Sequence, residues 1–111
     1  PKKERMPDSR KDKLEAMLAD DPADQTLRYM LAMELDKDGG DDRSLELLNG
    51  LMQDETPYVP AFLMAGQKLA RLGRIQDADT TYANGIQQAQ SQGDDHAAGE
   101  MTQFKMELNH A

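Results

Sequence analysis

The sequence predicts an all-α fold of about six helices arranged as antiparallel hairpins. The first observation is a period of 34 residues, which separates Leu14 from Leu48 and Leu48 from Tyr82. Gly39 recurs as Gly73 at the same interval. A fixed period in this range is typical of repeat proteins in which each unit is one supersecondary element. Apolar side chains also recur at helical spacing, and the polar segments between them are short enough to make successive helices antiparallel.

The first helix is predicted to follow a short tail. Residues 1–7 carry three cations and two prolines, and we expect them to form a disordered tail. Asp8 or Ser9 then caps a helix, since short polar side chains accept hydrogen bonds from the first turn. This helix ends before Pro22, because proline restricts the residue that precedes it.

The second and third helices are separated by glycines. Asp24 is the expected cap of the second helix, which runs to about residue 38 and is apolar around nearly its whole circumference. Such a helix is expected to be contacted from several sides. Gly39 ends it, since glycine readily takes the left-handed conformation found after helices. Asp41 or Asp42 is expected to cap the third helix.

The C-terminal half contains three further predicted helices. Pro60 marks the start of the fourth helix, and Gly73 ends it. The fifth runs from about residue 76 to residue 90, and Gly93 separates it from the sixth. The apolar face of the sixth helix is expected to consist of Ala97, Met101, Phe104 and Leu108.

Small residues are predicted where helices cross closely. Gly66 lies on the apolar face of the fourth helix, and helix axes approach to about 8 Å only when the contact residues are small. Gly85 lies inside the fifth helix, where glycine costs about 1 kcal/mol relative to alanine. We expect another backbone to press against it.

These positions resemble the pattern of the tetratricopeptide repeat (TPR) family, in which each unit is a pair of antiparallel helices. The first full unit, residues 25–58, holds Leu31, Ala32, Leu35, Gly39, Ser44, Leu48 and Leu51 at the family's positions. The second, residues 59–92, holds Phe62, Ala65, Gly66, Leu69, Gly73, Ala78, Tyr82 and Gly85. Four residues depart from the pattern: Arg28 stands where it prefers a bulky aromatic, Ala65 where it prefers leucine, and Thr56 and Gln90 where it prefers proline.

The resemblance implies a right-handed superhelix of helix hairpins that forms a single domain over residues 8–111. Residues 8–24 correspond to the second half of a preceding unit, and residues 93–111 form a capping helix. TPR domains bind extended or helical partners in a concave groove lined by the first helix of each unit. The resemblance therefore implies a protein–protein interaction scaffold or adaptor without catalysis, whose partner is an unidentified protein or peptide.

The groove of such a domain would be lined by the second and fourth predicted helices. The partner-binding candidates are Tyr29, Met30, Met33, Lys37, Leu63, Met64, Gln67 and Arg71. Methionine side chains repack around varied ligands, although they also serve as ordinary core filling. The alternative function is homo-oligomerisation or regulation through the exposed Met- and Leu-rich face, with a homodimer as the product.

One TPR subtype grips acidic C-terminal peptides with lysine and asparagine side chains. The matching positions here hold Tyr29, Met33, Leu63, Met64 and Gln67, none of which is basic. We therefore predict no binding of such peptides.

Composition excludes several other classes of function. The 111 residues have a net charge of −8, which disfavours nucleic-acid binding, and no apolar stretch approaches the length of a membrane span. The chain contains no cysteine, which fits a cytoplasmic protein and removes thiolate sites.

No motif for metal, cofactor or catalytic chemistry emerges from the sequence. The acidic run that starts at Asp36 lacks the glycine and glutamate of a calcium-binding loop, because those places hold Asp41 and Leu47. His96 and His110 stand outside any metal-ligand or acid–base pattern. We expect neither a metal nor a cofactor, and we expect no enzymatic activity.

Overall fold

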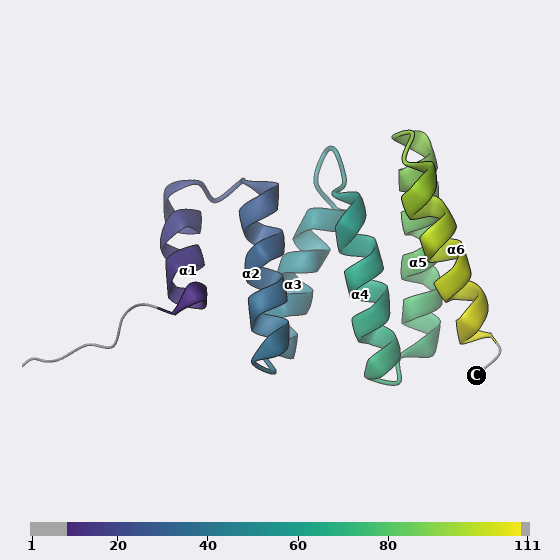
Figure 1. Ribbon diagram of the computed structural model, residues 1–111, viewed down its shortest axis with the longest axis horizontal. Coiled ribbons are helices and arrows are strands. Elements are labelled where there is room, and N and C mark those ends of the chain that lie inside the picture. Colours follow the sequence, from purple (N-terminus) through teal and green to yellow (C-terminus); the bar gives the residue numbers. More distant parts are fainter. Residues whose placement is uncertain (1–8, 110–111) are drawn as a thin grey trace, which may run out of the picture. The chain divides into compact units, whose positions relative to one another are not determined.

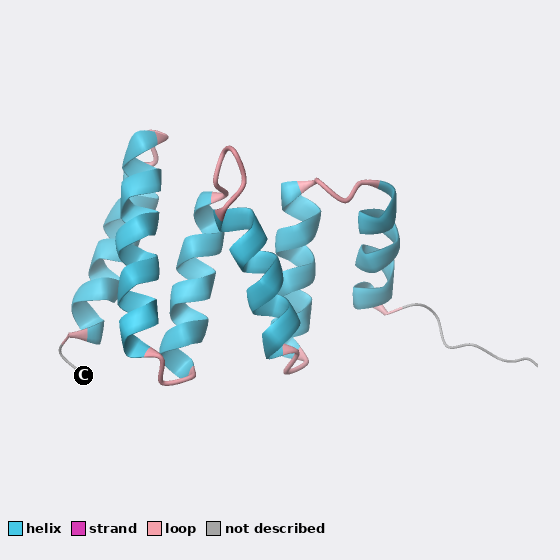
Figure 2. Cartoon of the chain, turned by 180° about the vertical axis from the view of Figure 1, so that it is seen from behind, coloured by secondary structure: helices cyan, strands magenta, loops and turns pink. Residues whose placement is uncertain are grey.

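The computed structural model describes residues 9–109, which form six α-helices and no strand (Figure 1, Figure 2). The predicted all-α fold is therefore confirmed. The predicted tail, residues 1–7, lies outside the described residues. The helices are α1 (Arg10–Asp20), α2 (Gln25–Lys37), α3 (Asp41–Met52), α4 (Val59–Arg71), α5 (Ile75–Ser91) and α6 (Asp95–Leu108).

Polar side chains cap three of the helices at their N-termini. The side chains of Ser9, Asp24 and Asp94 each accept a hydrogen bond from the backbone N–H three residues further on, at 3.1, 2.8 and 3.0 Å. The caps at Ser9 and Asp24 were predicted, but the cap predicted for α3 is wrong. Asp41 and Asp42 lie within its first turn, where their negative charges stabilise the positive end of the helix dipole.

Three glycines end helices in the left-handed conformation. Gly39, Gly73 and Gly93 have φ angles of 79°, 81° and 78°. In each case the following N–H donates to the carbonyl five residues earlier, at 2.8 to 2.9 Å. This bond satisfies a carbonyl that the helix leaves without an internal partner.

The chain divides into two compact units, residues 1–47 and 48–111. In the first unit α1 packs against α2. Leu14, Leu31 and Leu35 form the buried core, with Leu18, Leu27, Met30 and Leu47 packed around it. Arg43 of α3 donates to the carboxylate of Glu15 in α1 through both terminal guanidinium nitrogens, with Nη2 2.9 Å from Oε1. This hydrogen bonding holds the pKa of Glu15 below its ordinary value.

In the second unit α5 packs against both α4 and α6. A Cβ atom added at Gly66 would lie 2.3 Å from Cε1 of Tyr82, so this helix crossing depends on glycine, as predicted. A Cβ at Gly85 would lie 2.5 Å from both Cβ of Phe62 and Sδ of Met101. The prediction that a backbone presses on Gly85 is therefore wrong, because side chains from α4 and α6 fill that space.

Candidate functional site

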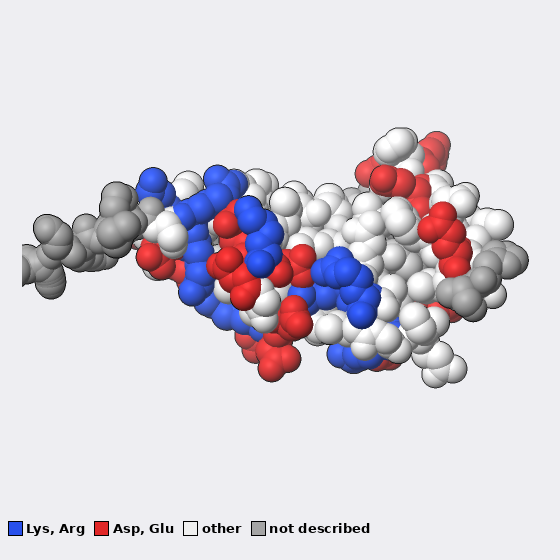
Figure 3. Space-filling view, turned by 60° about the horizontal axis from the view of Figure 1, so that its bottom comes forward, with Lys and Arg blue, Asp and Glu red and all other residues white. Residues whose placement is uncertain are grey.

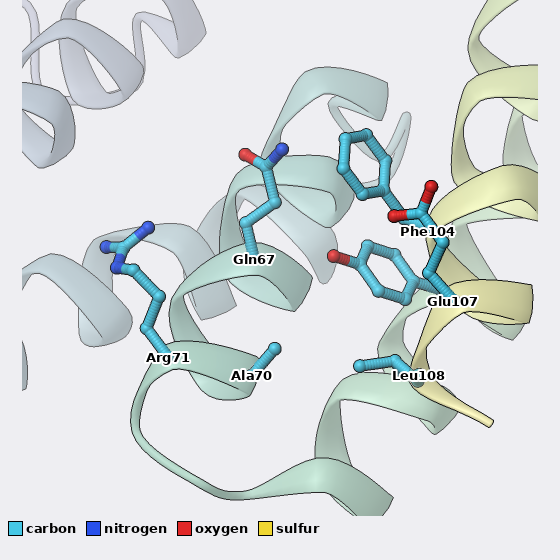
Figure 4. A pocket seen from close by; sticks show the side chains of 7 residues that line it. Gln67, Ala70, Arg71, Phe104, Glu107 and Leu108 are labelled. Atoms are coloured by element: carbon cyan, nitrogen blue, oxygen red, sulfur yellow. The ribbon is translucent and has the colours of Figure 1, made fainter. Parts of the chain in front are cut away.

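A cavity of about 430 Å³ lies between α4 and α6, with α5 beneath it (Figure 4). We call it the α4–α6 pocket. In Figure 4 the side chains of Ala70 and Leu108 face each other across it. Its lining consists of Gln67, Ala70 and Arg71 from α4, Tyr82 from α5, and Phe104, Glu107 and Leu108 from α6.

Two aromatic rings form part of the pocket wall. Tyr82 is buried and stacks on Phe104, with ring centroids 6.1 Å apart and an angle of 20° between the ring planes. Burial raises the pKa of the Tyr82 hydroxyl, and the carboxylate of Glu107 acts in the same direction against the opposing effect of Arg71. The phenol is therefore neutral at pH 7, so this wall is apolar apart from one uncharged hydroxyl.

Polar groups of three kinds line the same pocket. Gln67 supplies an amide that both donates and accepts hydrogen bonds, Arg71 supplies a cation and Glu107 an anion. The cation comes from α4 and the anion from α6, so they stand on opposite sides. Lys105 and Asp79 hold α6 to α5 nearby, with Nζ 3.4 Å from Oδ1. The pocket thus combines apolar walls with groups that can orient a polar chain.

A second cavity, of about 300 Å³, lies between α1 and α2 in the first unit. We call it the α1–α2 cleft. Its apolar lining is Leu14, Met17, Leu27 and Met30, and its charged lining is Arg10 and Lys13. The side chain of Met17 is 53% exposed, although Met17 follows the buried Leu14 by three residues, the spacing of one helix face. On the face drawn in Figure 3, Lys and Arg side chains lie interleaved with Asp and Glu side chains towards the N-terminal end of the chain.

A third cavity, of about 360 Å³, is lined mainly by uncharged polar side chains. Its residues are Asn49, Met52, Gln53, Phe62, Thr81, Asn84, Gln87 and Gln88. It contains none of the residues predicted to bind a partner.

The predicted partner-binding residues are distributed over several environments. Gln67 and Arg71 line the α4–α6 pocket, and Met30 lines the α1–α2 cleft. Met33 is 43% exposed, and the ammonium of Lys37 lies 3.1 Å from Oε2 of Glu34. The half-buried members are Tyr29, Leu63 and Met64. Neither the α4–α6 pocket nor the α1–α2 cleft is lined by Tyr29, Met33, Lys37, Leu63 or Met64. The role of these five residues in binding stays a prediction.

Three residues of α6 were not predicted to belong to the site. Phe104, Glu107 and Leu108 form one side of the α4–α6 pocket, whereas the sequence assigned their helix a capping role. The sequence contained a signal for these residues, because it predicts Phe104 and Leu108 on the apolar face of the sixth helix. The helix that follows a complete unit also stands where the first helix of a further unit would stand.

Within residues 9–109, no three side chains of histidine, aspartate or glutamate gather as metal ligands. In that same range, no helix has the length and apolar character required to cross a membrane.

Solved structures show what the chain is similar to. A tetratricopeptide repeat domain protein from Salinibacter ruber, in its solution NMR structure, is 34% identical, with a TM-score of 0.75. The match covers 79% of this chain and 89% of that one. This chain belongs to the tetratricopeptide repeat family. No protein-family model and no curated protein matches it.

Two further structures are similar to this TPR domain. The crystal structure of a TPR domain protein from Salinibacter ruber is 32% identical with a TM-score of 0.71, and covers 78% of this chain and 97% of that one. A protein from Bordetella parapertussis, in its solution structure, is 26% identical with a TM-score of 0.78. That match covers 94% of this chain and 90% of the other.

Proposed function

We propose that this TPR domain is a protein-interaction scaffold whose α4–α6 pocket receives an apolar side chain from a partner peptide or helix. The TPR fold is typically a non-catalytic scaffold, which supports a binding function. The observation that carries the proposal is the pocket itself, with its volume of about 430 Å³ and its walls of Ala70, Tyr82, Phe104 and Leu108. Ligand sites are commonly concave and mainly apolar, with a few polar groups that fix orientation.

The polar lining supports an extended or helical segment as the partner. The amide of Gln67 can hydrogen-bond a peptide group on either its N–H or its C=O side. Arg71 and Glu107 carry opposite charges on opposite walls, so a partner with an acidic and a basic residue flanking its apolar anchor fits in one orientation. Electrostatic complementarity of this kind contributes to specificity more than to affinity.

The proposal is tested with a substitution, Ala70→Phe, that fills the pocket and keeps its other lining residues. A peptide-display library is selected on the wild-type domain, and the enriched peptides are measured against Ala70→Phe. Because the new ring occupies the space of the anchor, we expect affinity to fall by at least about tenfold, which corresponds to about 1.4 kcal/mol. The matched control is Ala19→Phe, which places the same ring on an exposed position of α1.

Equal losses in the two variants would contradict the assignment of the pocket, and so would enriched peptides that bind Ala70→Phe as well as the wild type. Exchanging the charges through Arg71→Glu and Glu107→Arg tests the orientation. The double variant is expected to prefer peptides whose flanking charges are reversed.

A further inference from the structure

The cavity of about 360 Å³ in the second unit differs in chemistry from the α4–α6 pocket. We call it the amide cavity, because five of its eight lining side chains are carboxamides and a sixth is a hydroxyl. These six residues are Asn49, Gln53, Thr81, Asn84, Gln87 and Gln88, and the other two are Met52 and Phe62. The amide cavity shares no residue with the α4–α6 pocket, so the proposed function does not account for it.

No charged side chain lines the amide cavity, although charged residues make up 31% of the chain. A charge that leaves water is costly to bind without an opposite charge beside it, so this lining favours an uncharged ligand. Each carboxamide offers N–H donors and a C=O acceptor. The ligand that fits is therefore one that both donates and accepts hydrogen bonds.

The polar groups of the amide cavity are available to a ligand. Within residues 9–109, none of its five amides and neither atom of its hydroxyl makes a side-chain hydrogen bond to another protein group. Gln92, one turn beyond Gln88, shows the contrast, because its Nε2 donates to the carbonyl of Pro57 at 2.9 Å. The cavity amides face water instead, so a ligand that displaces this water must supply equivalent hydrogen bonds.

The spacing of the amides matches the repeat of an extended peptide. Asn84 and Gln88 of α5 are four residues apart, which corresponds to about 6 Å along the helix axis. Asn49 of α3 and Gln53 directly after it have the same spacing, and the N–H of Gln53 still donates to the Asn49 carbonyl at 3.1 Å. In an extended chain, alternate residues present their N–H and C=O groups to the same edge at intervals of about 6.6 Å. Each amide pair can therefore bond along one edge of such a chain.

The aromatic residue of the cavity argues against a sugar or a nucleobase as the occupant. Both need an exposed aromatic face to stack on. Phe62 is only 4% exposed, and its Cβ lies 2.5 Å from the place that a Cβ at Gly85 would occupy. A peptide main chain requires hydrogen-bonding groups rather than a stacking platform.

We infer that the amide cavity binds an extended, uncharged segment of a partner polypeptide through its main-chain peptide groups. Thr81 and Gln88 lie seven residues apart, or about 10 Å along α5, which matches about three residues of extended chain. Main-chain recognition of this kind depends little on the sequence of the segment. This site goes beyond the proposed function, which concerns an apolar side chain in a different pocket.

The probe is the blocked peptide acetyl-Ser-Thr-Ser-Thr-Ser-amide, which is uncharged and has no apolar anchor for the α4–α6 pocket. In the ¹⁵N-labelled chain, its titration is expected to shift the side-chain NH₂ signals of Asn49, Gln53, Asn84 and Gln88, and not that of Gln76. A second peptide with N-methyl groups on its three serines lacks the donors along one edge. It is expected to bind at least about tenfold more weakly.

The protein variants remove one amide from each wall. Gln53→Leu and Gln88→Leu are each expected to weaken binding of the unmethylated peptide by about three- to tenfold, because leucine keeps the size of the side chain and loses its hydrogen bonds. Gln90→Leu is the matched control, since Gln90 is an exposed glutamine of α5 that does not line the cavity. It is expected to leave the affinity unchanged.

Three outcomes would overturn the inference: no shift of the cavity signals at the solubility limit of the peptide, equal binding of the N-methylated peptide, or equal losses in Gln88→Leu and Gln90→Leu. Cavity signals that respond to maltose and not to the peptide would also overturn it and indicate a sugar site. Ala70→Phe is expected to bind this peptide as the wild type does. A failure here is therefore distinguishable from a failure of the proposed function.

Discussion

The two units of the chain carry the same repeat positions but differ in how completely those positions are covered. In the second unit α5 lies between two helices, and Met101 of α6 is 0% exposed against Gly85. In the first unit α1 packs against α2 and opens onto a cleft, and its Met17 is 53% exposed. The 34-residue period therefore determines which face of a helix is apolar. The presence of a neighbouring helix decides whether that face becomes core or stays exposed.

The largest expected effect is a difference in stability between alanine variants of Met101 and Met17. Met101→Ala is expected to lower the free energy of unfolding by about 2–5 kcal/mol, because it removes fully buried side-chain volume. Met17→Ala is expected to change it by less than about 0.5 kcal/mol, because most of that side chain is already exposed. Urea denaturation of both variants at low protein concentration measures the difference. Similar losses in the two variants would show that the first unit is as fully packed as the second.

The second expected effect concerns two helical glycines with opposite surroundings. Gly66→Leu is expected to destabilise the chain by about 1–3 kcal/mol, because the new side chain collides with the Tyr82 ring. Gly99→Leu is expected to stabilise it by up to about 1 kcal/mol, because the position is open and leucine favours helix. Thermal and urea unfolding of both variants provide the measurement. A loss of stability in Gly99→Leu would mean that the outer face of α6 is already packed within one chain.

The helices and their ends could be predicted because they depend on local chemistry. Proline, glycine and capping side chains act within a few residues of their own position, and the caps at Ser9, Asp24 and Asp94 follow from that. The burial of Leu14, Leu48 and Tyr82 follows from the period, since equivalent positions face equivalent neighbours. The wrong cap prediction at Asp41 or Asp42 is also a local matter. Aspartate is favoured both as a cap and in the first turn of a helix, so the sequence does not distinguish these two places.

The candidate site could be predicted only in part, because it depends on which helices meet. Gln67 and Arg71 were predicted from the repeat, whereas Phe104 and Glu107 lie more than 30 residues away and reach the pocket only through the packing of α6. The same limit applies to Gly85. Its helical position was evident from the sequence, but the two side chains that occupy the space beside it come from α4 and α6.

The third expected effect is a loss of stability, of equal size in the two units, when a glycine at a helix end is replaced. Gly39→Ala and Gly73→Ala are each expected to cost about 1 kcal/mol, because both glycines have left-handed φ angles and open space around them. The strain is local to the helix end, so the packing of the surrounding unit does not change it. Urea denaturation of the two single variants and the double variant tests this. Costs that differ by much more than about 0.5 kcal/mol, the usual error of additivity, would contradict a purely local origin.

The smallest expected effect is the pH-dependent ion pair between Glu15 and Arg43 in the first unit. Because the folded-state pKa of Glu15 lies below its ordinary value of 4.5, the pair stabilises the fold above that pH and ceases to do so as the pH falls through the lowered pKa. Both side chains are partly exposed, so Arg43→Gln is expected to cost only about 0.2–1 kcal/mol at pH 7. Once the pH lies well below the lowered pKa of Glu15, the difference from wild type is expected to shrink towards zero. Glu15→Gln is the control: it is expected to show the same loss at pH 7, with no further loss in the double variant. An Arg43→Gln cost that stays constant over this pH range would show that Arg43 stabilises α3 through packing of its side-chain stem rather than through the carboxylate.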